Sequence, residues 1–346
     1  MEYISGEILT ENGFKKGYIG LDKGKIIEFG REKPKEKPIA NGFIIPTLIN
    51  SHTHIGDYFI KELNIKLPNN IEKLVAPPKG IKHKLLKETS EKEIINGMKE
   101  SINIMSKSGI SKFYDFRENG ISGIQQLKEA IYDHEDISSL ILSRPNHLRY
   151  HKEEIKTLLE NSQGIGLSSI TDWDYSEILK IAKYTKIKNK IFAIHASERI
   201  RENIDLILDL KPDFLIHMNY ATESDLIRVK ENNISIAICP RSNKFFKLKT
   251  NFTNMEKLDI NLMLGTDNAM LNSPNIFTEL AYFKKISKTH SIEKLLNMIT
   301  YNPRKALNLD YNILDLKLPK EFIVLDNKTL KIIYAPSTHE EIKDDN

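Results

Sequence analysis

The sequence predicts an α/β fold, a (β/α)8 TIM-type barrel joined to a small β-sandwich that both termini build. Eight short β-rich runs alternate with helical stretches between residues 42 and 310, and eight parallel strands close such a barrel. Further β-rich runs lie near both ends, which predicts one domain at 1–41 plus 311–346 and another at 42–310. An open, doubly wound sheet is the competing interpretation, and it fits less well because no glycine-rich phosphate loop follows the first strand.

The elements follow from local patterns. Alternating residues with glycine at the turns predict a small β-unit before residue 41. Ser90 and Glu93 form a capping-box pair that predicts a helix over 90–109, and Thr222 and Asp225 repeat this pattern before another helix. The predicted barrel strands are 42–50, 110–116, 138–143, 164–170, 190–195, 213–218, 235–240 and 260–266.

Composition excludes several classes of protein. The 346 residues carry a net charge of only +4, and the basic run at 23–37 mixes both signs, so we expect no nucleic-acid partner. No apolar run approaches the ~20 residues of a membrane span, and the first residues do not form a signal peptide. Because Cys239 is the only cysteine, an intrachain disulfide is excluded and a cytoplasmic location is expected.

Histidines and an aspartate stand where predicted strands end. His52 and His54 follow the first strand, His195 ends the fifth, His217 the sixth and Asp267 the eighth. The carboxyl ends of barrel strands meet at one face, where such barrels hold their active sites. Two residues separated by one position on a strand point to the same side, so His52 and His54 can reach one ion. Imidazole and carboxylate ligands suit a divalent metal such as zinc.

Five motifs in this order resemble the amidohydrolase superfamily, and within it the metal-dependent aminohydrolases that deaminate cytosine, guanine, adenosine-type compounds and s-triazines. The motifs are "SHTH", "HASE", "IHMN", "CPRSN" and "GTDNA", and the later segment "TYNPRKALNL" is also similar. The resemblance covers nearly the whole chain. It implies the barrel, the companion β-sandwich and hydrolysis by metal-activated water.

The resemblance also implies roles for individual residues. His52, His54, His195 and Asp267 would bind one divalent metal ion, with zinc expected first and iron or manganese as alternatives. Glu198 would carry protons, His217 would face the substrate or the water, and Asp267 would also accept a proton. A binuclear site would need a lysine at the end of the third or fourth strand, and those ends, "LSRPN" and "LSSITD", have none.

The expected substrate is a small molecule, and its identity is open. The segment "GLSSITDWD" lacks the histidine that several of these deaminases carry after the fourth strand. Arginine at a barrel mouth can bind a carboxylate or phosphate, which suggests an anionic substrate, although ion pairs with Asp115, Glu118 or Asp172 are an equal alternative. The candidate substrate-binding residues are Arg117, Arg144, His83 and Asn268.

Structural interpretations stand beside each role. The histidines could be hydrogen-bonded core or strand-end residues, Glu198 a helix-start carboxylate and Asp267 an N-cap. Deamination of a nitrogen heterocycle is the function that the motifs favour. Hydrolysis of a cyclic amide or another C–N bond in an anionic metabolite is one alternative, and a non-catalytic barrel scaffold is another. A homo-oligomer is compatible with the sequence, which does not define the oligomeric state.

Overall fold

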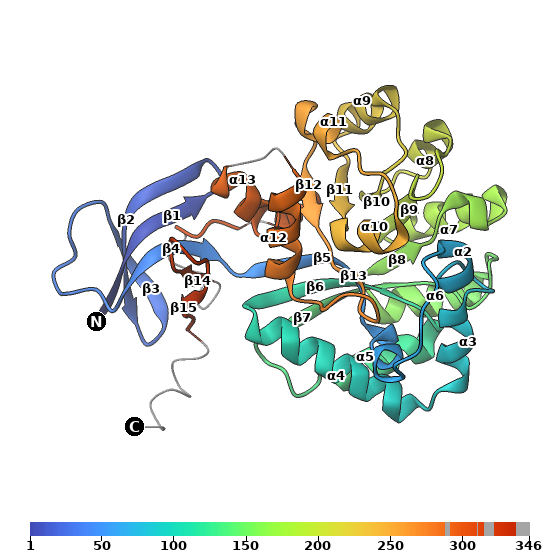
Figure 1. The fold of residues 1–346 in the computed structure, drawn as a ribbon, viewed down its shortest axis with the longest axis horizontal. Helices are drawn as coiled ribbons and strands as arrows, with labels where there is room; N and C mark the ends of the chain where they lie inside the picture. The colour runs from blue at the N-terminus through green and yellow to red at the C-terminus, as the bar shows by residue number, and fades with distance from the viewer. Residues whose placement is uncertain (288–290, 310, 315–321, 337–346) are drawn as a thin grey trace.

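A computed structural model describes residues 1–287, 291–309, 311–314 and 322–336, and these form two sheets with the larger one wrapped in helices (Figure 1). The larger sheet has nine strands and the smaller has six. Parts of the predicted segment 311–346 lie outside the described residues, namely 315–321 and the tail 337–346. Within the described parts of the chain, no helix has the length and apolar character needed to cross a membrane.

The nine-stranded sheet is parallel and curled, which confirms an α/β fold of the kind that TIM-type barrels have. Its strands follow one another in chain order from β5 to β12, and β13 pairs with β5. Because only two residues separate β12 from β13, the two ends of the sheet meet at one segment of chain. The strands are β5 (Leu48–His54), β6 (Ile110–Arg117), β7 (Ser138–Ser143), β8 (Gly164–Leu167), β9 (Ile191–Ala196), β10 (Phe214–His217), β11 (Ser235–Ile238), β12 (Leu262–Leu264) and β13 (Asp267–Asn268).

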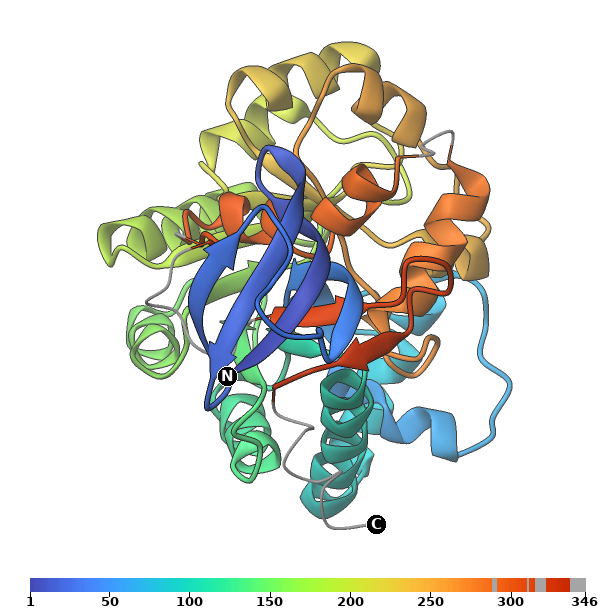
Figure 2. The same cartoon turned by 90° about the vertical axis from the view of Figure 1, so that its left-hand side faces the viewer.

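Helices surround this sheet, as the view from the side of the small sheet shows (Figure 2). The capping boxes at Ser90 and Thr222 are both present, so the two predicted helix starts are confirmed. The helices are α1 (Phe59–Glu62), α2 (Ile71–Leu74), α3 (Ile81–Glu88), α4 (Glu91–Lys107), α5 (Gly120–Ile131), α6 (Lys152–Asn161), α7 (Tyr175–Ile187), α8 (Ile204–Asp209), α9 (Glu223–Glu231), α10 (Pro240–Phe246), α11 (Phe252–Lys257), α12 (Ile276–Ile286), α13 (Ile292–Asn297) and α14 (Tyr301–Ala306), with short 3-10 turns at Ile55–Asp57 and Ile170–Asp172.

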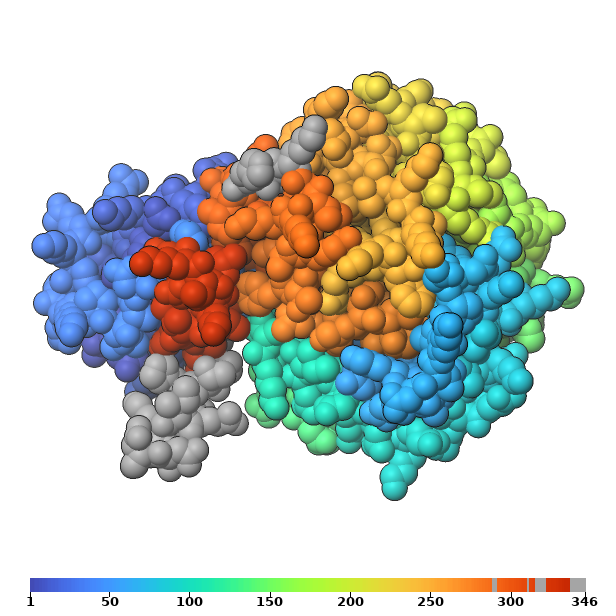
Figure 3. Space-filling view, viewed as in Figure 1, coloured from blue at the N-terminus to red at the C-terminus, as the bar shows by residue number. Residues whose placement is uncertain are grey.

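The six-stranded sheet joins segments from both ends of the chain, which pack side by side at one end of the molecule (Figure 3). Its order is β15-β14-β4-β1-β2-β3, and Ile4, Ile19, Ile44 and Val324 are buried in its own apolar cluster. The strands are β1 (Glu2–Thr10), β2 (Gly13–Asp22), β3 (Lys25–Gly30), β4 (Ala40–Pro46), β14 (Phe322–Leu325) and β15 (Ile332–Tyr334).

One predicted strand is wrong. The run 42–50 is two strands, with β4 in the small sheet and β5 in the curled sheet, and Thr47 between them. Both strands are almost entirely buried, and the apolar run of β4 continues into Leu48 and Ile49, so the stretch resembles one strand. Pro46, directly before Thr47, is the local signal of the change of sheet. The correction extends the curled-sheet strand to His54 and therefore places His52 and His54 within β5 itself.

Candidate active site

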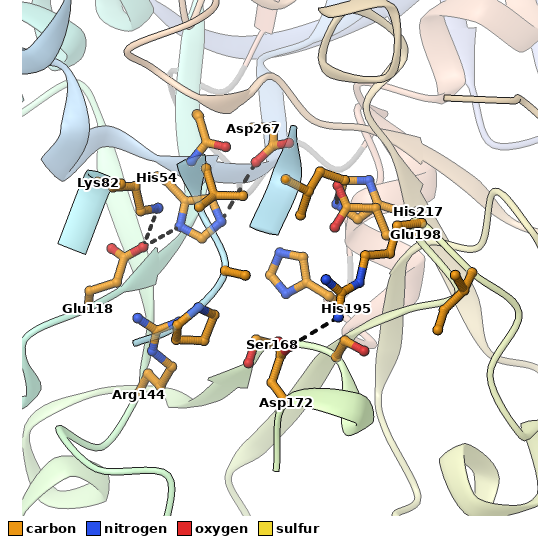
Figure 4. A pocket seen from close by; sticks show the side chains of 18 of the residues that line it. His54, Lys82, Glu118, Arg144, Ser168, Asp172, His195, Glu198, His217 and Asp267 are labelled. Carbon is orange, nitrogen blue, oxygen red and sulfur yellow. Dashed lines mark hydrogen bonds and ion pairs between the residues drawn. The ribbon is translucent and has the colours of Figure 1, made fainter. Parts of the chain in front are cut away.

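The predicted metal ligands converge at the carboxyl-terminal ends of the curled sheet's strands (Figure 4). His52 and His54 lie on β5, His195 on β9 and Asp267 on β13. Nε2 of His52 lies 3.2 Å from Nε2 of His195 and 3.4 Å from Oδ1 of Asp267, while Nε2 of His54 lies 3.7 Å from the same oxygen. Four residues that are up to 215 positions apart in the chain thus present donor atoms to one small volume.

The histidines are held as neutral rings with Nε2 directed at this volume. Nδ1 of His195 donates to the carbonyl of Leu167 at 2.8 Å, and Nδ1 of His54 lies 2.9 Å from Oε1 of Glu118. A carbonyl and a carboxylate only accept, so each Nδ1 carries the proton and each Nε2 keeps its lone pair. Burial, with the nearby Lys82 charge, lowers the pKa of His54 to about 4, and burial with the neighbouring imidazoles lowers the pKa of His195 well below its usual range.

The two carboxyl groups of the site have opposite protonation. Burial, together with the charges of Asp267 and Asp172, raises the pKa of Glu198 well above its ordinary value. Burial alone would also raise the pKa of Asp267, but the hydrogen bond and charge of His52, with the nearby His217, hold it well below the usual range. The structure therefore combines a protonated carboxyl and a carboxylate, which is the pattern of an acid and a base in one site.

His217 lies beside Glu198. Its Nε2 is 3.4 Å from Oε1 of Glu198, and burial lowers its pKa to about 3, so the ring is neutral. Nδ1 of His217, like Nδ1 of His52, is buried and has no hydrogen-bond partner among the described residues. Donor atoms of His52, His195 and His217 also lie within 4.8 Å of one another, so His217 reaches the same volume as the predicted ligands.

The backbone is strained where the strands end at this site. Ser197, His217, Met218 and Asp267 all have positive φ angles, of 45°, 75°, 56° and 60°. Residues other than glycine adopt this region at a cost of order 1–3 kcal/mol, and such residues cluster at functional sites. The strain turns the chain sharply after β9 and β10 and before β13, and the surrounding structure holds it.

Cys239 lies at the edge of the same cluster. Its Sγ is within 4.8 Å of donor atoms of His52 and Asp267. Burial, with the nearby Asp267 and Glu279, raises the pKa of this thiol well above its usual value, so it stays protonated. The side chain packs in an apolar cluster formed by the strands of the curled sheet.

The candidate substrate-binding residues have different positions. Arg144 and Asn268 line the pocket over the site. Arg117 is 1% exposed and pairs with Asp115 and Glu118, so the ion-pair alternative holds for this residue. His83 does not line this pocket, and its Nε2 lies 2.9 Å from the carbonyl oxygen of Val75.

Two residues at the site were not found from the sequence. Lys82, next to His83, lines the pocket and contacts Glu118 at 2.5 Å, and Glu118 contacts His54. Glu118 was considered only as a partner of an arginine, although its place after the second strand was a usable signal. Lys82 carries no such signal, because it lies within α3, in a long connection whose path the sequence pattern does not define.

A pocket that is open at its mouth leads to the site. One wall comes from α2 and the turn after it, where Ile71, Val75 and Pro77 present apolar surface. The opposite part carries hydroxyl and carboxyl groups, and Arg199 joins the two by ion pairs to Glu72 at 2.7 Å and Asp172 at 3.7 Å. These hydroxyl and carboxyl groups belong to Ser168, Ser169, Asp172, Glu198 and Glu202. A pocket with both apolar and polar walls suits a small heterocyclic compound.

Comparisons with known proteins agree with this site. The family model described as "Amidohydrolase family" matches residues 43–313. An uncharacterised protein of Methanocaldococcus jannaschii is 37% identical over 332 residues, covering 89% of this chain and 85% of that protein. A 5-methylthioadenosine/S-adenosylhomocysteine deaminase of Clostridium tetani is 28% identical, covering 85% and 76%. The structure of 5-methylcytosine deaminase from Klebsiella pneumoniae has a TM-score of 0.75 at 15% identity, covering 96% and 97% of the two chains.

The family match and these relatives define the class of protein. This chain belongs to the amidohydrolase family. It is a hydrolase that acts on carbon–nitrogen bonds other than peptide bonds.

Proposed function

We propose that this chain deaminates a nitrogen heterocycle by hydrolysis, with one divalent metal ion held by His52, His54, His195 and Asp267. The observation that carries the proposal is the convergence of these donors: Nε2 of His52 lies 3.2 Å from Nε2 of His195 and 3.4 Å from Oδ1 of Asp267, and Nε2 of His54 lies 3.7 Å from the same oxygen. Beside them, burial raises the pKa of Glu198, while His52 holds the pKa of Asp267 low, so the site combines a proton donor with a proton acceptor. The division into a barrel at 42–310 and a β-sandwich from both termini is part of the same proposal.

The donor set fits a zinc-like ion. Nε2 atoms of neutral imidazoles and a carboxylate oxygen are ligands that zinc prefers, and a catalytic site keeps one position for water. His54 and His195 each donate their other ring proton to a fixed acceptor, which is the usual support of a ligating histidine. A bound ion of this kind lowers the pKa of water towards ~7 and so supplies a nucleophile at neutral pH.

The residues around the ligands handle the protons. Asp267 is ionised because its pKa is held low, so its carboxylate is free to take up the proton of the attacking water. Glu198 gives its proton to a ring nitrogen, so that attack at the neighbouring carbon yields a neutral adduct. His217, neutral and 3.4 Å from Glu198, is placed to hold the water or the adduct through Nε2. The proton that Asp267 took from water passes to the amino group, which leaves as ammonia, while the hydroxyl group of the adduct gives its proton back to Glu198.

The relatives give the first substrates to test. The Clostridium tetani relative is named for 5-methylthioadenosine and S-adenosylhomocysteine, which are both adenosine derivatives. Zinc-loaded protein should release ammonia from at least one member of a panel that adds purines, pyrimidines, pterins and triazines to these two compounds. Absence of ammonia with every heterocycle, in protein that holds a stoichiometric metal ion, would refute deamination and favour the alternative of cyclic-amide hydrolysis.

An anionic group on the substrate is the second part of the proposal. Among the described residues the guanidinium of Arg144 has no hydrogen bond or ion pair, although it lines the pocket (Figure 4). A cation that is removed from water without a partner is costly, so a partner from the ligand is expected. Arg144 therefore favours a substrate with a carboxylate or phosphate at a distance from the amino group that leaves.

Two adenosine derivatives test whether Arg144 binds an anionic group of the substrate or whether its substitution lowers activity in general. S-adenosylhomocysteine carries a carboxylate, and 5-methylthioadenosine does not. Arg144→Lys should lower kcat/KM for the first about 10- to 100-fold, because an ammonium cannot form the bidentate pair, and leave the second nearly unchanged. Arg149→Lys, an exposed residue of the same loop, is the control. Equal losses for both compounds would contradict the role of Arg144.

A further inference from the structure

Five buried ionisable side chains form a row behind His54 in which acidic and basic groups alternate. The order is Asp57, Lys82, Glu118, Arg117 and Asp115, and each residue is at most 3% exposed. Successive members are in contact, at 3.5 Å, 2.5 Å, 2.7 Å and 3.3 Å. Buried charges are stable only when each has close partners, so the row is a built feature rather than a chance encounter.

One part of the row touches the strand that bears two of the predicted ligands. Oε1 of Glu118 accepts from Nδ1 of His54 at 2.9 Å. Oδ1 of Asp115 accepts from the Thr53 hydroxyl and from the backbone N–H of Ile55, both at 2.9 Å. The ring of His54 and the residues on both sides of it are therefore fixed by carboxylates of the second strand, β6.

The other end of the row reaches the segment that bears Asp267. Oδ2 of Asp57 accepts from the Asn268 side chain at 2.7 Å, and Oδ1 accepts from the backbone N–H of Met270 at 2.9 Å. Lys82 lies between Asp57 and Glu118 and so connects the two ends. The ammonium group of Lys82 therefore contacts both Glu118, which is hydrogen-bonded to His54, and Asp57, which is hydrogen-bonded to the chain after Asp267.

The packing leaves little freedom in this row. A Cβ added at Gly56 would lie 2.1 Å from a guanidinium nitrogen of Arg117, so only glycine permits the close approach of this turn to the arginine. Lys82 extends from α3, an element of the long connection after β5, into the interior. Without its charge, Glu118 would keep Arg117 as its only cationic partner among the described residues, and Asp57 would lose its only one.

We propose that Glu118 and Lys82 are positioning residues for the metal site: Glu118 fixes the ring of His54 so that Nε2 faces the ion, and Lys82 holds Glu118 and Asp57 in place. The inference rests on the proposed function, because it takes His54 as a ligand. Neither residue needs to touch the ion. Their effect is on how tightly the ion is held.

The test measures metal affinity, by competition of the metal-free protein and a chromogenic chelator for Zn2+. Glu118→Ala should weaken Zn2+ binding on the order of 100-fold and Glu118→Gln on the order of 10-fold, because the amide keeps an acceptor oxygen for His54. Lys82→Met should weaken it on the order of 10-fold. Lys84→Met, an exposed residue of the same helix, is the matched control and should bind as the unchanged protein does.

A purely structural role predicts a different result. In that case thermal unfolding of the metal-free variants would shift while Zn2+ affinity of the folded protein stayed the same, and this outcome would overturn the proposal. Should Glu118→Ala fail to fold, the near-isosteric Glu118→Gln decides. The Co2+-loaded variants give a second readout, because loss of the His54 ligand should change the intensity of the visible absorption bands.

The result also separates this inference from the proposed reaction. Weaker Zn2+ binding in the variants supports the positioning role even if no heterocycle releases ammonia. Unchanged Zn2+ binding refutes it even if the unchanged protein proves to be an active deaminase.

Discussion

Oε1 of Glu198 lies 3.4 Å from Nε2 of His217, and burial shifts the pKa of each group towards its neutral form. Burial raises the pKa of the Glu198 carboxyl group and lowers that of the His217 imidazole. The carboxyl group therefore does not transfer its proton to the ring. Asp267, whose carboxylate stays ionised, lies within 4.8 Å of both. The site therefore stores one available proton on Glu198 beside one available base, Asp267.

The first prediction separates proton transfer from metal binding. Glu198→Gln should keep the metal ion, because the residue is not a proposed ligand, and should lower the rate on the order of 10²–10⁴-fold. Metal content by elemental analysis and steady-state ammonia release measure the two effects. Glu100→Gln, on the exposed face of α4, is the control. Loss of the metal ion, or an unchanged rate, would be incompatible with the proposed role.

The second prediction concerns pH. Glu198 must hold a proton to act as an acid, and burial raises its pKa. The rate should therefore be maintained on the acidic side of this raised pKa and fall as the pH rises through it. A profile of kcat/KM against pH should show this alkaline limb above the ordinary range of a glutamic acid, and Glu198→Gln should lack it. A rate that increases steadily with pH, with no alkaline limb, would argue against Glu198 as the acid.

The third prediction concerns the ion itself. His52→Ala and His195→Ala should each lose metal and activity together, because each removes an Nε2 donor from a site with four ligands. His147→Ala, an exposed histidine away from the strand ends, should keep both. Full metal occupancy in both ligand variants would refute the assignment.

The sequence predicted most of the site because the ligands follow strong strand signals. His52, His195, His217 and Asp267 all stand at ends of short apolar runs, and the carboxyl ends of parallel strands must meet. The pattern could not define the supporting residues. Lys82 lies in a long connection and contacts Glu118, the hydrogen-bond partner of His54. Only the packed structure shows that Lys82, and not the neighbouring His83, lines the pocket.

The split of the first strand was also beyond the sequence. β4 is buried in the small sheet and β5 in the curled sheet, so a similar run of buried residues occurs in two different sheets. Pro46, directly before Thr47, marks an interruption, but a single proline does not show that the chain passes from one sheet to the other there. The sequence also could not decide whether Arg117 and Arg144 pair with protein carboxylates or face the substrate. The answer depends on distances between strand ends, which a periodic pattern does not give.

The last prediction concerns the close approach of two strands at the metal site. A Cβ added at Gly265 would lie 2.5 Å from Cβ of His52 and 2.9 Å from its backbone nitrogen, so β5 or the segment before Asp267 must move. Gly265→Ala should therefore weaken Zn2+ binding and destabilise the protein by about 1–3 kcal/mol, as overpacking does. Gly24→Ala offers the contrast, because its Cβ would meet nothing within 4 Å and the cost comes only from a φ of 71°. That variant should lose about 1 kcal/mol of stability and keep its Zn2+ affinity. Chelator competition and thermal unfolding distinguish the two, and equal Zn2+ affinity in both variants would mean that the spacing of β5 and β13 does not control the ligand geometry.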